Sequence, residues 1–186
     1  KTFYKVSTPL AAHWNHNDCI STEDNDFQAI VKKLKGNEAV LQLIRDYTQA
    51  KHSVWGINAR NREQNFSLNL LLDPDIDFVS LQGSAGTGKT LLTIAAGLTQ
   101  VLDQNRYNEI LMTRVTIPVG EDIGFLPGTE EEKMTPWMGA LMDNLEVLHG
   151  TQVGGSFGRG ATQDLLQNKI KIRSLNFMRG RTFLNR

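Results

Sequence analysis

The sequence Gly83-Ser84-Ala85-Gly86-Thr87-Gly88-Lys89-Thr90 is a complete G-x-x-x-x-G-K-[ST] pattern, which is typical of a phosphate-binding loop. An apolar run at 78–81 precedes it, and a second apolar run at 91–98 follows it. A phosphate-binding loop lies between a strand and a helix, so this order of elements supports a functional reading of the pattern. The sequence therefore predicts a strand over 78–82 and a helix from about Lys89 to residue 103.

Each position of the pattern has a physical task. Gly83, Gly86 and Gly88 let the backbone turn tightly and present N–H groups to an anion without interference from Cβ atoms. The following helix points its unpaired N–H groups at the same anion. Lys89 is predicted to reach the β- and γ-phosphates, and Thr90 to hold Mg²⁺ through its hydroxyl. The pattern thus predicts ATP and Mg²⁺ as cofactors; the alternative is a glycine-rich turn with an incidental lysine.

Length and composition limit the class of protein. A chain of 186 residues suits one domain with an appendage, and 40% hydrophobic residues indicate a globular fold. Lysine plus arginine equals aspartate plus glutamate at 20 each, so no global basic charge points to nucleic acid, although a local patch could do so. The single cysteine excludes an internal disulfide and favours a reducing, cytoplasmic location. No apolar run approaches the length of a membrane span.

The first fifty residues differ from the rest and are expected to form a small β-rich connector, residues 1–50. Alternation around Phe27, the turn Lys35–Glu38 and the apolar run 40–47 predict a β-hairpin, although a helical period also fits 27–34. A polar linker and a helix over 63–72 follow, and the helix is expected to stop at Asp73-Pro74.

The remaining segment, 51–186, is expected to form an α/β domain with a parallel sheet. A strand over 109–113 follows the predicted loop and helix, and strand–helix–strand implies parallel pairing with a right-handed connection. Proline at the first position favours a helix over 135–149. Alternation over 170–175 predicts a third strand.

Further candidate residues are arginines that follow predicted strands. Arg114 comes at the carboxyl edge, where open α/β sheets bind ligands, and the alternative is a solvated loop arginine. Arg179 and Arg181 flank a glycine and suit phosphate or RNA, on this chain or across a subunit boundary; the alternative is a basic turn. The residue types of 13–19 could also ligate zinc, but no second ligand pair follows.

One feature expected of an ATPase is missing from the sequence. ATP hydrolysis in this class of fold needs an apolar strand that ends in an acid and holds the Mg²⁺ shell. No such Walker B strand follows the loop before Arg186. The sequence therefore leaves two further functions open: a nucleotide-binding assembly or scaffold module without significant turnover, and a small-molecule kinase.

Several blocks together resemble the PhoH family, bacterial P-loop ATPases related to superfamily 1 helicases. The resemblance extends over about 55–186, and the middle blocks are more specific than the loop. The blocks are 83–90, 113–114, 117–120, 122–128, 131–134, 136–137 and 178–183. The segments 54–57 and 72–75 resemble the subgroup in which a PIN ribonuclease domain precedes the ATPase, so residues 1–50 would be the connector that follows the nuclease.

The resemblance implies a RecA-like parallel sheet with flanking helices, ATP hydrolysis, a homo-oligomeric and often hexameric ring, and remodelling or unwinding of single-stranded RNA. It also implies a Walker B strand after the 178–183 block, and the chain stops before it. By similarity to the helicases, Gln64 becomes an adenine contact and Arg114 an RNA or phosphate contact. A glutamine amide can pair with both the donor and the acceptor of adenine.

Overall fold

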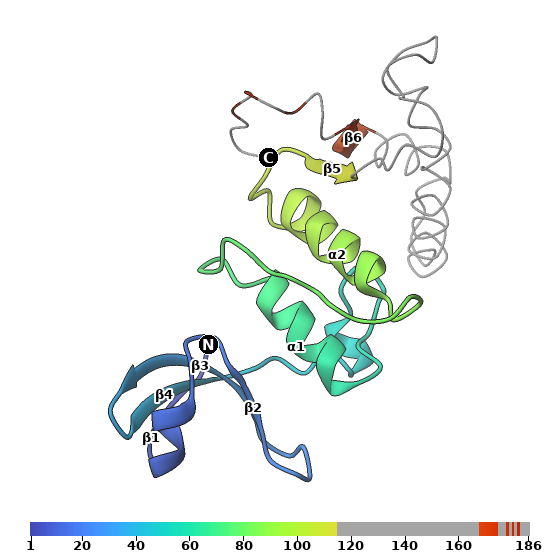
Figure 1. The fold of residues 1–186 in the computed structure, drawn as a ribbon. Coiled ribbons are helices and arrows are strands. Elements are labelled where there is room, and N and C mark those ends of the chain that lie inside the picture. Colours follow the sequence, from blue (N-terminus) through green and yellow to red (C-terminus); the bar gives the residue numbers. More distant parts are fainter. Residues whose placement is uncertain (115–167, 175–177, 179, 181, 183–186) are drawn as a thin grey trace. The chain divides into compact units, whose positions relative to one another are not determined.

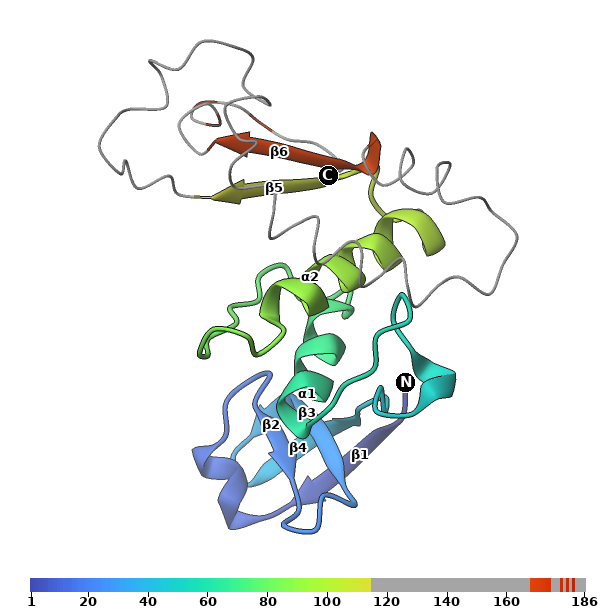
Figure 2. The same ribbon diagram turned by 90° about the vertical axis from the view of Figure 1, so that its right-hand side faces the viewer.

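The structure is a computed structural model, and it describes residues 1–114, 168–174, 178, 180 and 182. The chain divides into two units: Lys1–Ser53 with Asn58–Gln82, and Val54–Ile57 with the residues from Gly83 onward. Each unit is described by itself (Figures 1 and 2). The predicted division into 1–50 and 51–186 stays a prediction.

The first unit is built on an antiparallel sheet of four strands in the order β1-β4-β3-β2. The strands are β1 (Phe3–Ser7), β2 (Cys19–Ser21), β3 (Gln28–Lys35) and β4 (Glu38–Leu43), with the 3₁₀ turns η1 (Pro9–His13) and η2 (Ala50–His52). The hairpin β3–β4 confirms the predicted hairpin and excludes the helical alternative. Its turn contains Gly36 at φ +58°, where a glycine carries no Cβ penalty. The strands β1 and β2 and both 3₁₀ turns were not predicted.

A β-bulge interrupts the hairpin. Val31 pairs with Leu41 and Lys33 with Val40, so Lys32 is the extra residue on β3. One face of the sheet carries an apolar cluster that includes Ala29, Val31, Ala39 and Leu41. A bulge bends its strand and changes the direction of the inserted side chain. The Lys32 side chain accordingly leaves the regular alternation of the sheet, and its Nζ donates to Asp73.

Helix α1 (Arg62–Leu71) confirms the predicted helix over 63–72. Its N-cap is Asn61, whose side chain accepts a hydrogen bond from the Gln64 N–H at 2.9 Å. Two asparagines one turn apart connect α1 to the chain after β4: Asn65 accepts from the Tyr47 N–H at 2.9 Å, and Asn69 accepts from the Arg45 N–H at 2.8 Å. These bonds satisfy backbone groups that have no strand partner.

The second unit contains α2 (Lys89–Leu98), which continues into the single π turn η3 (Thr99–Asp103), and then β5 (Ile110–Arg114). Strand β5 pairs in parallel with β6 (Ile170–Ser174), as Figure 2 shows. The predicted helix over 89–103 and the strands near 109–113 and 170–175 are confirmed. Parallel pairing is confirmed for these two strands only; the full RecA-like sheet is not shown.

The predicted strand over 78–82 is wrong for the structure as described. None of the described residues forms a strand ladder with this segment, and Phe78 is 85% exposed. An apolar run becomes a strand only when a neighbour pairs with its N–H and C=O groups. The predicted helix over 135–149 lies outside the described residues. No helix within the described ranges is long and apolar enough to cross a membrane.

Candidate functional site

The predicted phosphate-binding loop, Gly83–Thr90, runs directly into the first turn of α2. Gly86 has φ +78°, and Gly88, the N-cap residue of α2, has φ +82°. Residues with a Cβ rarely adopt this left-handed conformation, so the positions of these two glycines follow from the backbone path. Because Gly88 is followed at once by helix, the unpaired N–H groups of the first turn of α2 lie beside the loop.

The Lys89 side chain, at the start of α2, folds back onto the loop. Its Nζ donates to the backbone oxygens of Gly83 at 2.9 Å and Ser84 at 2.7 Å, and to Thr87 Oγ1 at 3.2 Å. The Thr87 hydroxyl in turn donates to the Ser84 oxygen at 3.0 Å. These bonds hold the loop in a compact turn around the ammonium group. The arrangement concentrates one positive charge and several N–H donors in an exposed loop, which is the chemistry of an anion site.

Thr90 and Ala85 complete the loop. Both residues are exposed, and Thr90 lies in the first turn of α2, one residue after Lys89. Thr93, one turn further, donates its hydroxyl to the Lys89 backbone oxygen at 2.9 Å, inside the helix. The structure thus brings together all of the residues that the sequence pattern predicts for the loop.

The other predicted site residues do not belong to the loop segment itself. Gln64 lies on α1, in the first unit, and its Oε1 accepts a hydrogen bond from the Arg60 N–H at 2.8 Å. Gln64 therefore has a structural role at the start of α1 that the sequence analysis did not predict. Arg114 is the last residue of β5 and stands opposite Ser174 in the ladder. Arg179 and Arg181 lie outside the described residues.

A short turn that the sequence analysis treated as linker belongs to the second unit. Val54 and Ile57 exchange two backbone hydrogen bonds of 2.9 Å, and Trp55 and Gly56 both have positive φ. Positive φ at both central residues is the signature of a type I′ turn. Burial raises the pKa of Asp103 at the end of η3, and a hydrogen bond from Trp55 partly offsets that effect. Gly56 is the local sequence signal for this turn.

The zinc ligand set considered for residues 13–19 is not supported. Among the residues that the structure describes, no group of three or more histidine, cysteine, aspartate or glutamate side chains could hold a metal ion.

Comparisons with known proteins place this geometry in a family. The family model described as PhoH-like protein matches residues 56–186. Protein PhoH2 of Bacillus subtilis is 43% identical over 134 residues, which are 69% of this chain and 28% of that protein. The PhoH-like protein of Synechocystis is 29% identical over 184 residues, 97% of this chain and 52% of that protein.

Protein PhoH of Escherichia coli K12 is 33% identical over 129 residues, 69% of this chain and 34% of that protein. The chain therefore spans well under two thirds of the length of these relatives. No solved structure matches the chain. The family model begins at Gly56, inside the type I′ turn, and includes the whole of the loop Gly83–Thr90. Because that match covers most of the sequence, the chain belongs to the PhoH family.

Proposed function

We propose that this chain binds ATP with Mg²⁺ at the loop Gly83–Thr90. The observation that carries the proposal is the pair of left-handed glycines, Gly86 and Gly88, leading into α2 with Lys89 folded over the loop. Membership of the PhoH family supports the same reading. A triphosphate is the ligand of choice because its β- and γ-phosphates match a loop of N–H donors at a helix N-terminus.

Lys89 would exchange its present partners for phosphate oxygens. Its current acceptors, two peptide oxygens and one hydroxyl, are neutral. A phosphate oxygen carries negative charge, so a bond from the ammonium group to phosphate adds an attraction between opposite charges that the present neutral acceptors do not give. Binding of the anion therefore compensates for the loss of the bonds within the loop. Ser84, Ala85 and Thr87 would contribute their backbone N–H groups to the same anion.

Thr90 is the residue proposed to hold Mg²⁺ through its hydroxyl. Mg²⁺ keeps several waters and is usually bound through one or two protein ligands together with substrate phosphates. The exposed hydroxyl in the first turn of α2 suits that donor set. When bound, the ion supplies neutralisation of charge on the phosphates. A Walker B acid would complete the site.

The proposal extends to the other predicted contacts. Gln64 would contact the adenine, and it would have to exchange its hydrogen bond with Arg60 for the base. A Gln64→Ala variant tests this contact, because its loss should reduce the preference for ATP over GTP. Arg114, Arg179 and Arg181 would contact phosphate or single-stranded RNA.

For the whole protein we propose ATP hydrolysis coupled to unwinding or remodelling of single-stranded RNA. We further propose a cytoplasmic, homo-oligomeric ring, a hexamer by similarity, and a PIN ribonuclease domain before this segment. The family match supports the ATPase part of this proposal. The RNA, ring and PIN parts rest on the resemblance of the sequence blocks described above.

Release of phosphate by the full-length protein tests the proposal. We expect magnesium-dependent release that single-stranded RNA stimulates and that Lys89→Ala abolishes. ATP binding without release, unaffected by RNA, would instead identify a scaffold module. Transfer of phosphate to a small-molecule acceptor would identify a kinase.

A further inference from the structure

Strand β1 forms one edge of the four-stranded sheet of the first unit, and its outer side has no partner strand among the described residues. Its pairing with β4 is continuous from Phe3 to Ser7, without a bulge. The strand contains no proline, and all of its residues except Val6 are exposed. Proteins commonly protect an edge of this kind by a bulge, a proline or a covering element. The open edge of β1 is therefore a candidate surface for binding another strand.

The backbone hydrogen bonds at the two ends of β1 show which groups face the open side. The Thr2 oxygen accepts from the Leu43 N–H at 2.9 Å, and the Thr8 N–H donates to the Asn37 oxygen at 2.8 Å. In an antiparallel pair every second residue bonds to the neighbouring strand, so the even-numbered residues of β1 face β4. The odd-numbered residues point their N–H and C=O groups away from the sheet: Phe3, Lys5 and Ser7.

The side chains of β1 place aromatic rings on both faces of this edge. Tyr4 pairs with Leu41, a residue of the apolar cluster, so its ring lies on the same face of the sheet as the cluster. The Tyr4 side chain is 47% exposed, and its ring packs edge-on against Phe27 with 5.9 Å between centroids. Phe3 has its side chain on the opposite face and is 53% exposed. Large apolar side chains at an open edge favour a strand that covers them.

Lys5 is the one charged residue of β1, and a lysine in an edge strand normally opposes pairing. Here its ammonium group lies 3.3 Å from the carboxylate of Glu38 on β4. The charge of Lys5 is therefore compensated from its own sheet. Because like charges are unfavourable only where they stand directly opposite each other, Lys5 restricts the register of an added strand without excluding one.

We propose that β1 pairs with β1 of a second copy of this chain, antiparallel and about a two-fold axis. Such a ladder joins only groups that face outward, so an odd-numbered residue stands opposite an odd-numbered one. Registers that put Lys5 opposite Lys5 or Lys1 of the second copy bring like charges together and are unfavourable. Of the long registers one remains, in which Tyr4 stands opposite Tyr4 and Phe3 opposite Lys5.

This register gives each exposed aromatic side chain of β1 a partner. Tyr4 and its copy form a pair that exchanges no backbone hydrogen bonds, in which Cα atoms approach to about 4.5 Å, so the two rings touch on the apolar face. Phe3 faces the Lys5 ammonium group of the second copy, and a cation is attracted to the face of an aromatic ring. The surface of β1 is thus complementary to itself in hydrogen bonds, in shape and in charge.

The inference does not rest on nucleotide binding at Gly83–Thr90, which belongs to the other unit. It also differs from the proposed ring, because a two-fold contact closes after two chains whereas a ring needs head-to-tail contacts. If the chains also form a ring, pairing through β1 doubles the mass of that ring. The ratio of the masses of parent and variant therefore reports on β1 in either case.

The experiment measures the molar mass of the 186-residue chain by analytical ultracentrifugation, over a wide series of concentrations and without nucleotide. The test variant is Lys5→Pro, which removes an outward N–H group and leaves the hydrogen bonds to β4 in place. Lys5→Met is the matched control, because it removes the same charge and keeps the N–H group. Circular dichroism and urea unfolding show whether each variant folds.

We expect the parent and Lys5→Met to reach twice the mass of Lys5→Pro at high concentration. A second readout tests the register in a Cys19→Ser background, where Tyr4→Cys should give a disulfide-linked dimer under mild oxidation. Val6→Cys, on the same face of β1, should give none, since Val6 stands opposite Thr2 of the second copy. This cross-link decides the question if Lys5→Pro does not fold.

Three results overturn the proposal. The first is an equal mass of the parent and a folded Lys5→Pro protein at every concentration, whether both are single chains or larger assemblies. The second is an equal fall in mass in Lys5→Met and Lys5→Pro, because the backbone ladder would then not be the cause. The third is the absence of a cross-link at Tyr4, or an equal cross-link at Val6.

Discussion

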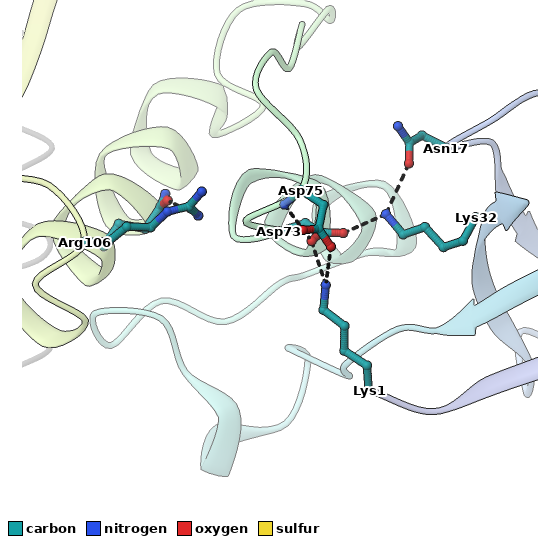
Figure 3. Close-up of polar contacts among 7 residues, drawn as sticks. Lys1, Asn17, Lys32, Asp73, Asp75 and Arg106 are labelled. Carbon is teal, nitrogen blue, oxygen red and sulfur yellow. Dashed lines mark hydrogen bonds and ion pairs between the residues drawn. The ribbon is translucent and has the colours of Figure 1, made fainter. Parts of the chain in front are cut away.

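Lys32 Nζ lies 2.7 Å from Asp73 Oδ2, a contact between side chains that are 11% and 2% exposed. The bulge in β3 supplies the lysine, and the chain leaving α1 supplies the carboxylate. Lys1 Nζ lies 2.7 Å from the other oxygen of the same carboxylate. One buried carboxylate thus connects three segments of the first unit (Figure 3).

Asp73→Asn should destabilise the first unit by about 3 kcal/mol, because removal of one partner from a buried ion pair leaves an uncompensated charge. Asp75→Asn is the matched control, since the Asp75 side chain is 77% exposed and its contact with Lys1 is a surface pair. Urea unfolding followed by circular dichroism measures both. Equal effects of the two substitutions would show that the buried pair does not stabilise the fold.

Asp73 should also make stability depend on pH in the acid range. Burial raises the pKa of Asp73, but hydrogen bonds from Lys1 and Lys32 outweigh that effect and hold the pKa at about 2, below the ordinary 3.8. As the pH falls, the unfolded state takes up this proton first. The contribution of Asp73 is therefore present above about pH 4 and is lost toward pH 2, a change of about 2 kcal/mol.

The measurement is the difference in unfolding free energy between the parent and Asp73→Asn at pH 5, 4, 3 and 2. Other carboxylates titrate in both proteins and cancel in the difference. We expect the difference to shrink as the pH falls. A difference that stays constant over this range would contradict the assigned pKa.

Replacement of Gly86 by alanine should weaken MgATP binding by more than its backbone strain explains, and Gly36→Ala is the control for that strain. Gly36 and Gly86 have φ of +58° and +78°, and a Cβ on either would have no neighbour within 4 Å. Alanine at either position should therefore cost a similar 1–2 kcal/mol, roughly, from backbone strain. Only Gly86→Ala should weaken MgATP binding, because only that Cβ would stand at the proposed anion site. Equal ATP affinity in both variants would argue against the loop as the binding site.

Packing of α2 on β5 can be tested at Gly97. A Cβ at this position would lie 3.0 Å from Ile110 Cδ1, which is closer than normal contact allows. Alanine is favoured over glycine in a helix by about 1 kcal/mol, and the clash opposes that gain. Ile110→Val removes the clashing methyl group, so Gly97→Ala should be more favourable in that background than in the parent. A double-mutant cycle by thermal unfolding measures the coupling, and additive effects would contradict the contact.

The sequence predicted correctly those elements whose ends are set by nearby residues, such as turn glycines, prolines and helix caps. The hairpin around Gly36, the stop of α1 before Pro74 and the loop entering α2 all follow from turn, proline and capping chemistry. The segment 78–82 shows the limit, because a strand depends on a partner that no local pattern reveals. Strand β1 was missed for the same reason: it is defined by its pairing with β4, far along the chain.

The same distinction between local and long-range contacts applies to the site residues. The eight residues of the loop are contiguous, so the sequence alone brought them together. The pairing of Lys32 with Asp73 needs a bulge, and the open edge of β1 follows from the strand order of the sheet. Neither is visible before the fold is known. The hydrogen bond between Gln64 and Arg60 follows from the N-terminal position of Gln64 in α1, a signal that the spacing from Asn61 could have provided.

The affinity of this chain for MgATP, measured by isothermal titration calorimetry for the parent and for Lys89→Ala, tests the central claim most directly. Lys35→Ala, at an exposed position of β3, is the control for loss of one positive charge. Loss of a charged hydrogen bond to phosphate is worth about 1.5–3 kcal/mol, or roughly ten- to a hundredfold in affinity. We predict that Lys89→Ala weakens binding by at least this factor while Lys35→Ala leaves it unchanged. Equal affinity in all three proteins would contradict the account.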